Sequence, residues 1–151
     1  MDSEAASMAL QAFVDADFRQ VSISDHGLLV RYDSGLIVLY CPIRCFRDRK
    51  VLFECLLPVA KEFDTGIYSW GKIRKIAVDD QDCSLRILFE DGAILSAFPV
   101  ESGRVGTELC WVSRFKTTGT SGISYLVGTT KGLFRDGDAG FEFPRPPETA
   151  K

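Results

Sequence analysis

The chain has 151 residues, of which 46% are hydrophobic and 26% are charged, and its formal net charge is −3. This length suits one domain, and the average charged fraction argues against intrinsic disorder. The mildly acidic balance disfavours nucleic-acid binding, which needs a basic surface to displace counterions. No apolar run approaches the ~20 residues of a membrane span, and the acidic start at residues 1–4 does not fit a secretory signal. We therefore predict a single cytoplasmic domain over residues 1–151 with no nucleic-acid or membrane partner.

Residues 4–18 are predicted to form one amphipathic helix, with Ser3 as its N-cap. The apolar residues of this segment recur at three- and four-residue steps, which places them on one helical face: Leu10, Phe13, Val14 and Phe18. We expect this face to lie on a sheet.

An internal repeat follows the predicted helix. Segments 21–42 and 76–99 each contain a short apolar alternation, a polar turn, a second strand, an acidic–glycine turn and a third apolar strand that stops at proline. Three pairs of residues keep the same offset between the two segments: Tyr32 and Phe89, Gly35 and Gly92, Pro42 and Pro99. Alternation with glycine-containing turns is typical of β-hairpins. The repeat therefore predicts two three-stranded β-meanders, over residues 20–42 and 72–100.

The third strand of each repeat is apolar at nearly every position, over residues 36–41 and, less strictly, 93–98. A strand with one wet face alternates, whereas a continuously apolar strand is covered on both faces. We expect the N-terminal helix on one side of the sheet and other β elements on the other.

The rest of the chain is also predicted to be mostly β. Residues 51–57 are apolar and fit either a buried strand or a short helix. A third β region is predicted over residues 108–143, and it includes a strand near 123–127. The fold prediction is therefore mainly β within the α+β class. In it an N-terminal helix packs on an antiparallel sheet or open barrel, which two repeated β-meanders and a C-terminal hairpin region form.

Residues 144–151 are rich in proline, which cannot donate to a strand ladder. This segment is predicted to be a flexible tail. Phe141 and Phe143, just before it, are candidates for an exposed apolar patch.

The densest acidic residues lie in the second meander: Asp79, Asp80, Asp82, Glu90 and Asp91. We interpret them as a partner-binding surface that docks onto a basic groove, because opposed potentials speed association and select partners. The alternative is a solvated turn, since Asp side chains bond the local backbone there. The spacing does not match an EF-hand, so no metal is predicted.

Two other groups of residues are candidate sites. Cys41, Cys45 and Cys55 match no zinc-module spacing, and five cysteines at irregular intervals are typical of reduced thiols that pack as small hydrophobes. In the basic run at residues 44–50, Arg44 and Arg49 are candidate nucleotide contacts. The alternative interpretation is that this run is a solvated connecting loop. No acid–base or nucleophile arrangement emerges, so we predict neither an enzyme nor a cofactor.

The repeated unit at residues 21–38 and 76–95, followed by a strand that carries Trp111, resembles small bacterial β proteins of unknown function. Some of these are similar to the immunity partners of secreted polymorphic toxins. The resemblance implies a cytoplasmic, non-catalytic protein whose partner is another protein, and it implies no fixed functional residues.

The leading hypothesis is therefore a protein-binding module, an immunity-type inhibitor that occludes the active site of an intracellularly acting toxin with a basic domain. Two alternatives stay open. One is a structural or assembly subunit that binds through a β edge such as the strand near residues 123–127. The other is a nucleotide-sensing β-barrel that uses Arg44 and Arg49.

Overall fold

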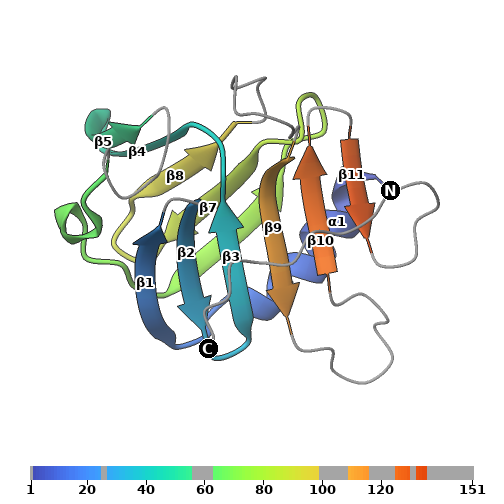
Figure 1. The fold of residues 1–151 in the computed structure, drawn as a ribbon, viewed down its shortest axis with the longest axis horizontal. Coiled ribbons are helices and arrows are strands. Elements are labelled where there is room, and N and C mark those ends of the chain that lie inside the picture. Colours follow the sequence, from blue (N-terminus) through green and yellow to red (C-terminus); the bar gives the residue numbers. More distant parts are fainter. Residues whose placement is uncertain are drawn as a thin grey trace.

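The computed structural model describes residues 2–24, 27–55, 63–98, 109–115, 125–129 and 132–135. These residues form two antiparallel β-sheets that face each other, with one helical segment at the N-terminus (Figure 1). The predicted mainly β, α+β fold is confirmed. The strand orders of the two sheets are separate, so the described strands do not close into a barrel.

The first sheet has six strands in the spatial order β1-β2-β3-β9-β10-β11. Their bounds are β1 Phe18–Ser24, β2 Gly27–Tyr32, β3 Gly35–Leu39, β9 Leu109–Phe115, β10 Tyr125–Thr129 and β11 Gly132–Arg135. The second sheet has five strands in the order β5-β4-β8-β7-β6. Their bounds are β4 Ile43–Arg47, β5 Lys50–Cys55, β6 Ile73–Val78, β7 Leu85–Phe89 and β8 Ile94–Ala97.

The two predicted meanders are confirmed, and each lies in a different sheet: β1-β2-β3 in the first and β6-β7-β8 in the second. Tyr32 and Phe89 end the middle strands, and both are buried in the core. The turns that follow them differ. Tyr32 pairs directly with Gly35 across a two-residue turn. In the second meander Phe89 pairs with Ala93 around a three-residue loop that ends on Gly92 at φ +91°, the left-handed residue that such loops require.

The strands that follow each meander cross to the opposite sheet. β4 comes directly after the first meander in sequence, yet it pairs with β8 of the second. In the same way β9 follows the second meander and pairs with β3 of the first. Each sheet is therefore built from both halves of the chain.

The N-terminal helix is shorter than predicted. The α-helix α1 covers Ser3–Ala9 and continues as a 3-10 turn, η1, over Leu10–Phe13. The predicted helix over 4–18 is therefore wrong beyond residue 13, because Asp15 takes a positive φ of 64° and Phe18 already begins β1. The predicted cap is also wrong: the carboxylate of Asp2, rather than Ser3, accepts the Ala5 amide at 2.8 Å.

β6 is the edge strand of its sheet, and the helical segment covers this edge. Ser7 Oγ accepts the Val78 amide at 2.9 Å, and Gln11 Nε2 donates to the Ile76 carbonyl at 3.2 Å. In Figure 1 the helix lies behind β10 and β11, so it extends the second layer beyond β6. Satisfying edge groups in this way prevents the strand from pairing with another chain.

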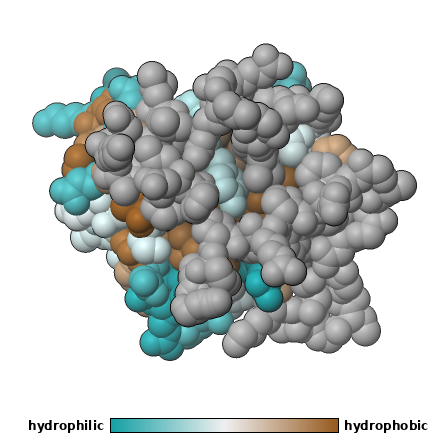
Figure 2. Space-filling model, in the orientation of Figure 1, coloured by the Kyte–Doolittle hydropathy of each residue, from teal (hydrophilic) through white to brown (hydrophobic). Residues whose placement is uncertain are grey.

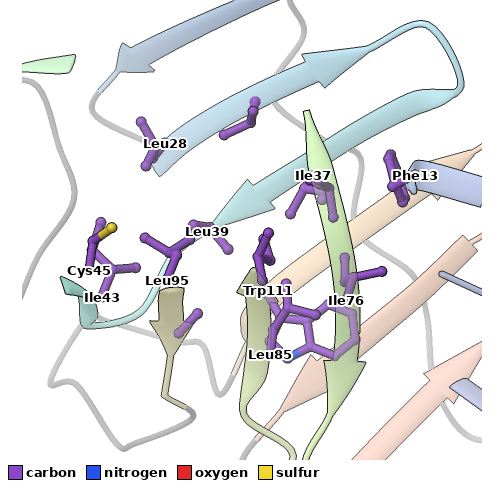
Figure 3. Close-up of a cluster of buried hydrophobic side chains, with 14 of the residues drawn as sticks. Phe13, Leu28, Ile37, Leu39, Ile43, Cys45, Ile76, Leu85, Leu95 and Trp111 are labelled. Atoms are coloured by element: carbon purple, nitrogen blue, oxygen red, sulfur yellow. The ribbon is translucent and has the colours of Figure 1, made fainter. Parts of the chain in front are cut away.

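The core lies between the sheets, where residues from both layers interdigitate (Figure 3). The largest fully buried side chain is Trp111 of β9, which lies near Leu85 and Ile76 of the facing sheet. Within the described ranges, no helix has the length and hydrophobicity that crossing a membrane would demand.

Two further predictions are resolved by the strand order. The apolar stretch at 51–57 contains a strand, β5, rather than a helix. The strand near 123–127 corresponds to β10, which lies between β9 and β11 and is not an edge. The prediction that this strand is an exposed edge available for binding is therefore wrong. The predicted flexible tail at 144–151 and the patch residues Phe141 and Phe143 lie outside the described residues.

Candidate functional site

The candidate site is the acidic turn, which we define as residues 79–84 between β6 and β7. Its backbone is closed by two hydrogen bonds, from the Asp79 amide to the Ser84 carbonyl at 2.9 Å and from the Cys83 amide to the Asp79 carbonyl at 3.0 Å. Cys83 adopts φ +62°, a left-handed conformation that reverses the chain tightly. The turn therefore has one defined shape.

Two of its carboxylates fold back onto the turn. Asp79 Oδ1 accepts the Gln81 amide at 2.7 Å, while Asp79 Oδ2 lies 3.0 Å from Arg86 Nη2. Asp82 Oδ1 accepts the Ser84 amide at 2.9 Å, and hydrogen bonding from Ser84 holds the pKa of Asp82 below its usual value. These are the local bonds that the solvated-turn interpretation predicts.

The three aspartates differ in what they offer a partner. The side chain of Asp79 is only 19% exposed and is neutralised by Arg86. Asp80 and Asp82 are exposed at the end of the hairpin. The turn therefore presents the carboxylates of Asp80 and Asp82 to solvent, on a backbone that bonds to Asp79 and Asp82 help to fix.

A tryptophan from the opposite sheet braces this turn. The indole Nε1 of Trp111 donates to the Cys83 carbonyl at 2.9 Å, and the Trp111 side chain is fully buried. Gly128 of β10 lies against the same ring, where a Cβ atom would approach Nε1 to 2.1 Å. The acidic turn is therefore anchored through the core to β9, and glycine at position 128 makes room for the anchor.

The other two predicted site residues lie elsewhere. Glu90 and Asp91 follow β7, whereas the acidic turn precedes it, so a five-residue strand of about 17 Å separates the two groups. The structure thus brings together Asp79, Asp80 and Asp82 but not all five acidic residues. Glu90 is exposed at its separate turn.

Asp91 is held in a network of its own. Its carboxylate accepts the Tyr68 hydroxyl at 2.8 Å and the Ala93 amide at 3.0 Å, and it lies 2.8 Å from Arg47 Nη1. Partial burial raises the pKa of Asp91, but the Ala93 and Tyr68 hydrogen bonds and the Arg47 charge outweigh it and leave the pKa below its usual value. Burial, with the hydrogen bond to Asp91, raises the pKa of Tyr68.

This network sits on an aromatic cluster that the sequence did not reveal. Its rings pack with centroids between 5.2 and 6.1 Å apart: Phe53, Phe63, Tyr68, Trp70 and Phe89. All five side chains are buried. The cluster therefore stabilises the fold at the β7–β8 turn. Asp91 contributes to this stabilisation through its bonds to Tyr68, Ala93 and Arg47, rather than to a docking surface. The only sequence signal was the aromatic density of residues 63–70.

The basic run does not form a common site. Arg44 is on β4 and makes an ion pair with Glu54 of β5, with Nη2 and Oε2 2.7 Å apart. Arg49 lies in the β4–β5 turn with φ +69°. Arg44 is therefore occupied by a neighbouring carboxylate, and nothing in this arrangement favours a nucleotide contact.

The predicted cysteine packing is visible at Cys41, Cys45 and Cys55, which are all buried. All five cysteines of the chain are thiols. Burial, with the nearby Asp91 charge, raises the pKa of Cys45 to about 12. Within the described ranges, no group of His, Cys, Asp and Glu side chains is placed to hold a metal ion.

No protein-family model, no curated protein and no solved structure matches this chain significantly. Its function is therefore inferred from the geometry of the acidic turn.

Proposed function

We propose that this protein is a non-catalytic binding module that acts in the cytoplasm as an immunity-type inhibitor of a toxin. In this proposal the acidic turn enters the basic, substrate-binding groove of the toxin and occludes its active site. Asp80 and Asp82 supply the charges that meet the groove. All five cysteines are thiols rather than disulfides in the structure, and proteins of reducing compartments rarely carry disulfides.

The observation that carries the proposal is the bracing of an exposed acidic loop. Asp80 and Asp82 are exposed, while the backbone beneath them is fixed by Asp79 and by the Trp111 indole. A binding loop held in one conformation loses little conformational entropy when a partner binds. Fixed negative charge also steers a basic partner and raises the association rate. These two properties are what an occluding inhibitor needs.

The first experiment identifies the partner by affinity capture of the tagged protein from its native cell extract. Mass spectrometry at low and moderate salt should find one stoichiometric basic protein whose capture weakens as salt rises. Recovery of no such protein would overturn the proposal.

The second experiment assigns the binding to the turn by association kinetics with the captured partner. Asp80→Asn/Asp82→Asn should lower the association rate about tenfold at low salt and reduce its salt dependence. The matched control, Glu4→Gln/Glu90→Gln, removes the same charge from exposed sites outside the turn and should leave the rate nearly unchanged. Equal effects of the two double variants would show that net charge, rather than the acidic turn, governs binding.

A further inference from the structure

The outer face of the five-stranded sheet carries a row of apolar side chains. Cys45, Leu95 and Ile87 are paired in register and point into the core. Side chains alternate between the two faces of a sheet, so the neighbours of these residues along β4, β8 and β7 point away from the core. The register aligns four outward residues across β5, β4, β8 and β7, and we call them the apolar row: Val51, Phe46, Ile94 and Leu88.

The apolar row is open to solvent. Val51 is 56% exposed, and the other three side chains are partly exposed. None of the four belongs to the hydrophobic core that the described residues form. The five-stranded sheet lies behind the six-stranded one in Figure 1, and brown hydrophobic atoms reach the surface at the left of Figure 2, in the region of β4 and β5. A continuous exposed apolar patch of this kind marks an interaction surface.

Charged side chains border the apolar row on both sides. Residues two positions apart on a strand share a face, so these side chains flank the row on the outer face. The first border is aligned across β5, β4 and β7 by the register: Glu54, Arg44 and Arg86. The second border lies in the turns after β4 and β7, two positions beyond the row: Arg49, Asp48 and Glu90. All six are exposed. Taken in the same strand order, their signs are −, +, + in the first border and +, −, − in the second.

We propose that this face binds the same face of a second copy of the chain, about a two-fold axis that runs along the apolar row. This rotation places each strand over the same strand of the other copy and exchanges the two borders. Because the signs of the borders are opposite at every strand, each charge meets an opposite charge of the second copy: Glu54 meets Arg49, Arg44 meets Asp48, and Arg86 meets Glu90. The inference is independent of the acidic turn, which lies beyond the face at the end of the β6–β7 hairpin.

The charge pattern selects this arrangement over the other face-to-face dimer. A two-fold axis parallel to the strands, along the central β8, would place β4 over β7. Arg44 would then meet Arg86, and Asp48 would meet Glu90. Like charges brought together across an interface are strongly unfavourable. Borders of mixed sign also disfavour a membrane surface or a nucleic acid, which attract basic residues only.

The β4–β5 turn supplies two of the border residues in an unusual backbone conformation. Arg47 pairs with Lys50 across this turn, so Asp48 and Arg49 form a two-residue loop. Both have positive φ, 54° and 69°. Loops of this type favour glycine, asparagine and aspartate at such positions. Arg49 therefore sits where its backbone is unfavourable and where its charge completes the border.

The size of the face predicts a weak dimer. Five strands about 4.8 Å apart, with about five residues on each, give a flat area of about 400 Å² per copy. Stable interfaces bury about 800 Å² on each partner. We therefore expect a dissociation constant on the order of 10–100 µM at low salt.

The first test is the oligomeric state of the full chain. Sedimentation velocity at low salt, from micromolar to millimolar concentration, should show the monomer converting to a dimer. Added salt should weaken the dimer, because the border charges are exposed. A chain that stays monomeric throughout would overturn the proposal. Binding to anionic lipid vesicles without dimerisation would assign the face to a membrane and would overturn it as well.

The second test exchanges the charges of one border pair. Arg44→Glu and Asp48→Lys each place like charges in both copies of the contact, so each variant alone should dimerise about tenfold more weakly. An equal mixture of the two should form a heterodimer, because each variant supplies the charge that the other lacks. The matched control is Arg19→Glu, which reverses an exposed arginine that also pairs with a carboxylate, Asp33, but lies on β1 of the other sheet. This control should dimerise like the unaltered protein.

The mixing experiment gives results that would contradict the arrangement. No heterodimer from folded variants, or equal weakening by Arg19→Glu, would show that these borders do not meet. A stronger dimer with Arg44→Glu would indicate the axis parallel to the strands. The apolar row is tested separately by Phe46→Ser, which should weaken the dimer about tenfold, with Met8→Ser on α1, 69% exposed, as the control that should not. An unchanged dimer with folded Phe46→Ser would remove the row from the interface.

Discussion

The bond between Trp111 and the acidic turn can be tested by Trp111→Phe. This change removes the indole N–H that reaches the Cys83 carbonyl at 2.9 Å and keeps an aromatic ring in a fully buried position. A hydrogen bond contributes a net ~1 kcal/mol, and an unsatisfied buried acceptor costs about 1–3 kcal/mol. Complete truncation of a buried Phe or Trp costs about 3–5 kcal/mol, which sets the upper limit. We expect the free energy of unfolding to fall by about 2–3 kcal/mol in urea denaturation.

The more specific result is local. Amide hydrogen exchange within residues 79–84 should accelerate more than exchange in the core strands, because the turn loses its anchor as well as global stability. The matched control is Trp70→Phe, since Trp70 Nε1 also donates to a loop carbonyl, that of Thr65, at 2.9 Å. That variant should lose comparable stability and leave the acidic turn no more mobile than the core. If both variants change the turn equally, Trp111 does not brace it.

Three further results follow from the same structure. Gly128→Ala should lower the melting temperature, because its Cβ would lie 2.1 Å from Trp111 Nε1 and must displace the ring; an unchanged melting temperature would contradict this packing. Asp91 has a lowered pKa, so the stability it contributes is present above the carboxylate's unfolded-state pKa of about 4 and is lost as pH falls through the folded-state value. Asp91→Asn should therefore flatten the acid limb of a stability–pH curve, and an unchanged limb would refute the assignment. Cys83 is the least buried of the five thiols and should be alkylated first in native protein, as mass spectrometry of the modified peptides can check.

The meanders were predictable because their signals are local. Alternation, the turn residues and the stop at proline all act within a few positions of one another. The helix was predicted to be too long for a related reason. Its apolar periodicity continues to Phe18, but periodicity does not reveal that Asp15 turns the chain with a positive φ. The bridge between Val14 and Ile73 then ties the segment to β6, a contact between residues far apart in sequence.

In the candidate site, too, the bonds within the turn were predictable from the sequence, whereas the contacts between residues far apart in the sequence were not. Local bonds at Asp79 and Asp82 are those that Asp-rich turns generally make, so sequence alone identified the turn. The interpretation that grouped Asp91 with this turn as one surface did not take account of the strand between them, β7. In contrast, the partners of Asp91 and of Cys83 come from strands and loops that meet only through the pairing of β4 with β8 and the packing of β9.

The exchange of strands between the two halves explains why the third strand of each meander is apolar. β3 and β8 end their meanders in sequence but lie inside their sheets, because β9 and β4 pair with their outer edges. A half without its partner would leave such a strand as an apolar edge, which is prone to pair with other chains. Each half therefore needs strands that the other half supplies, and these long-range pairings must form before either sheet is complete. Folding dominated by such non-local pairing is slow. The continuously apolar third strands of the repeat are the strands at which each half of the chain pairs with the other half.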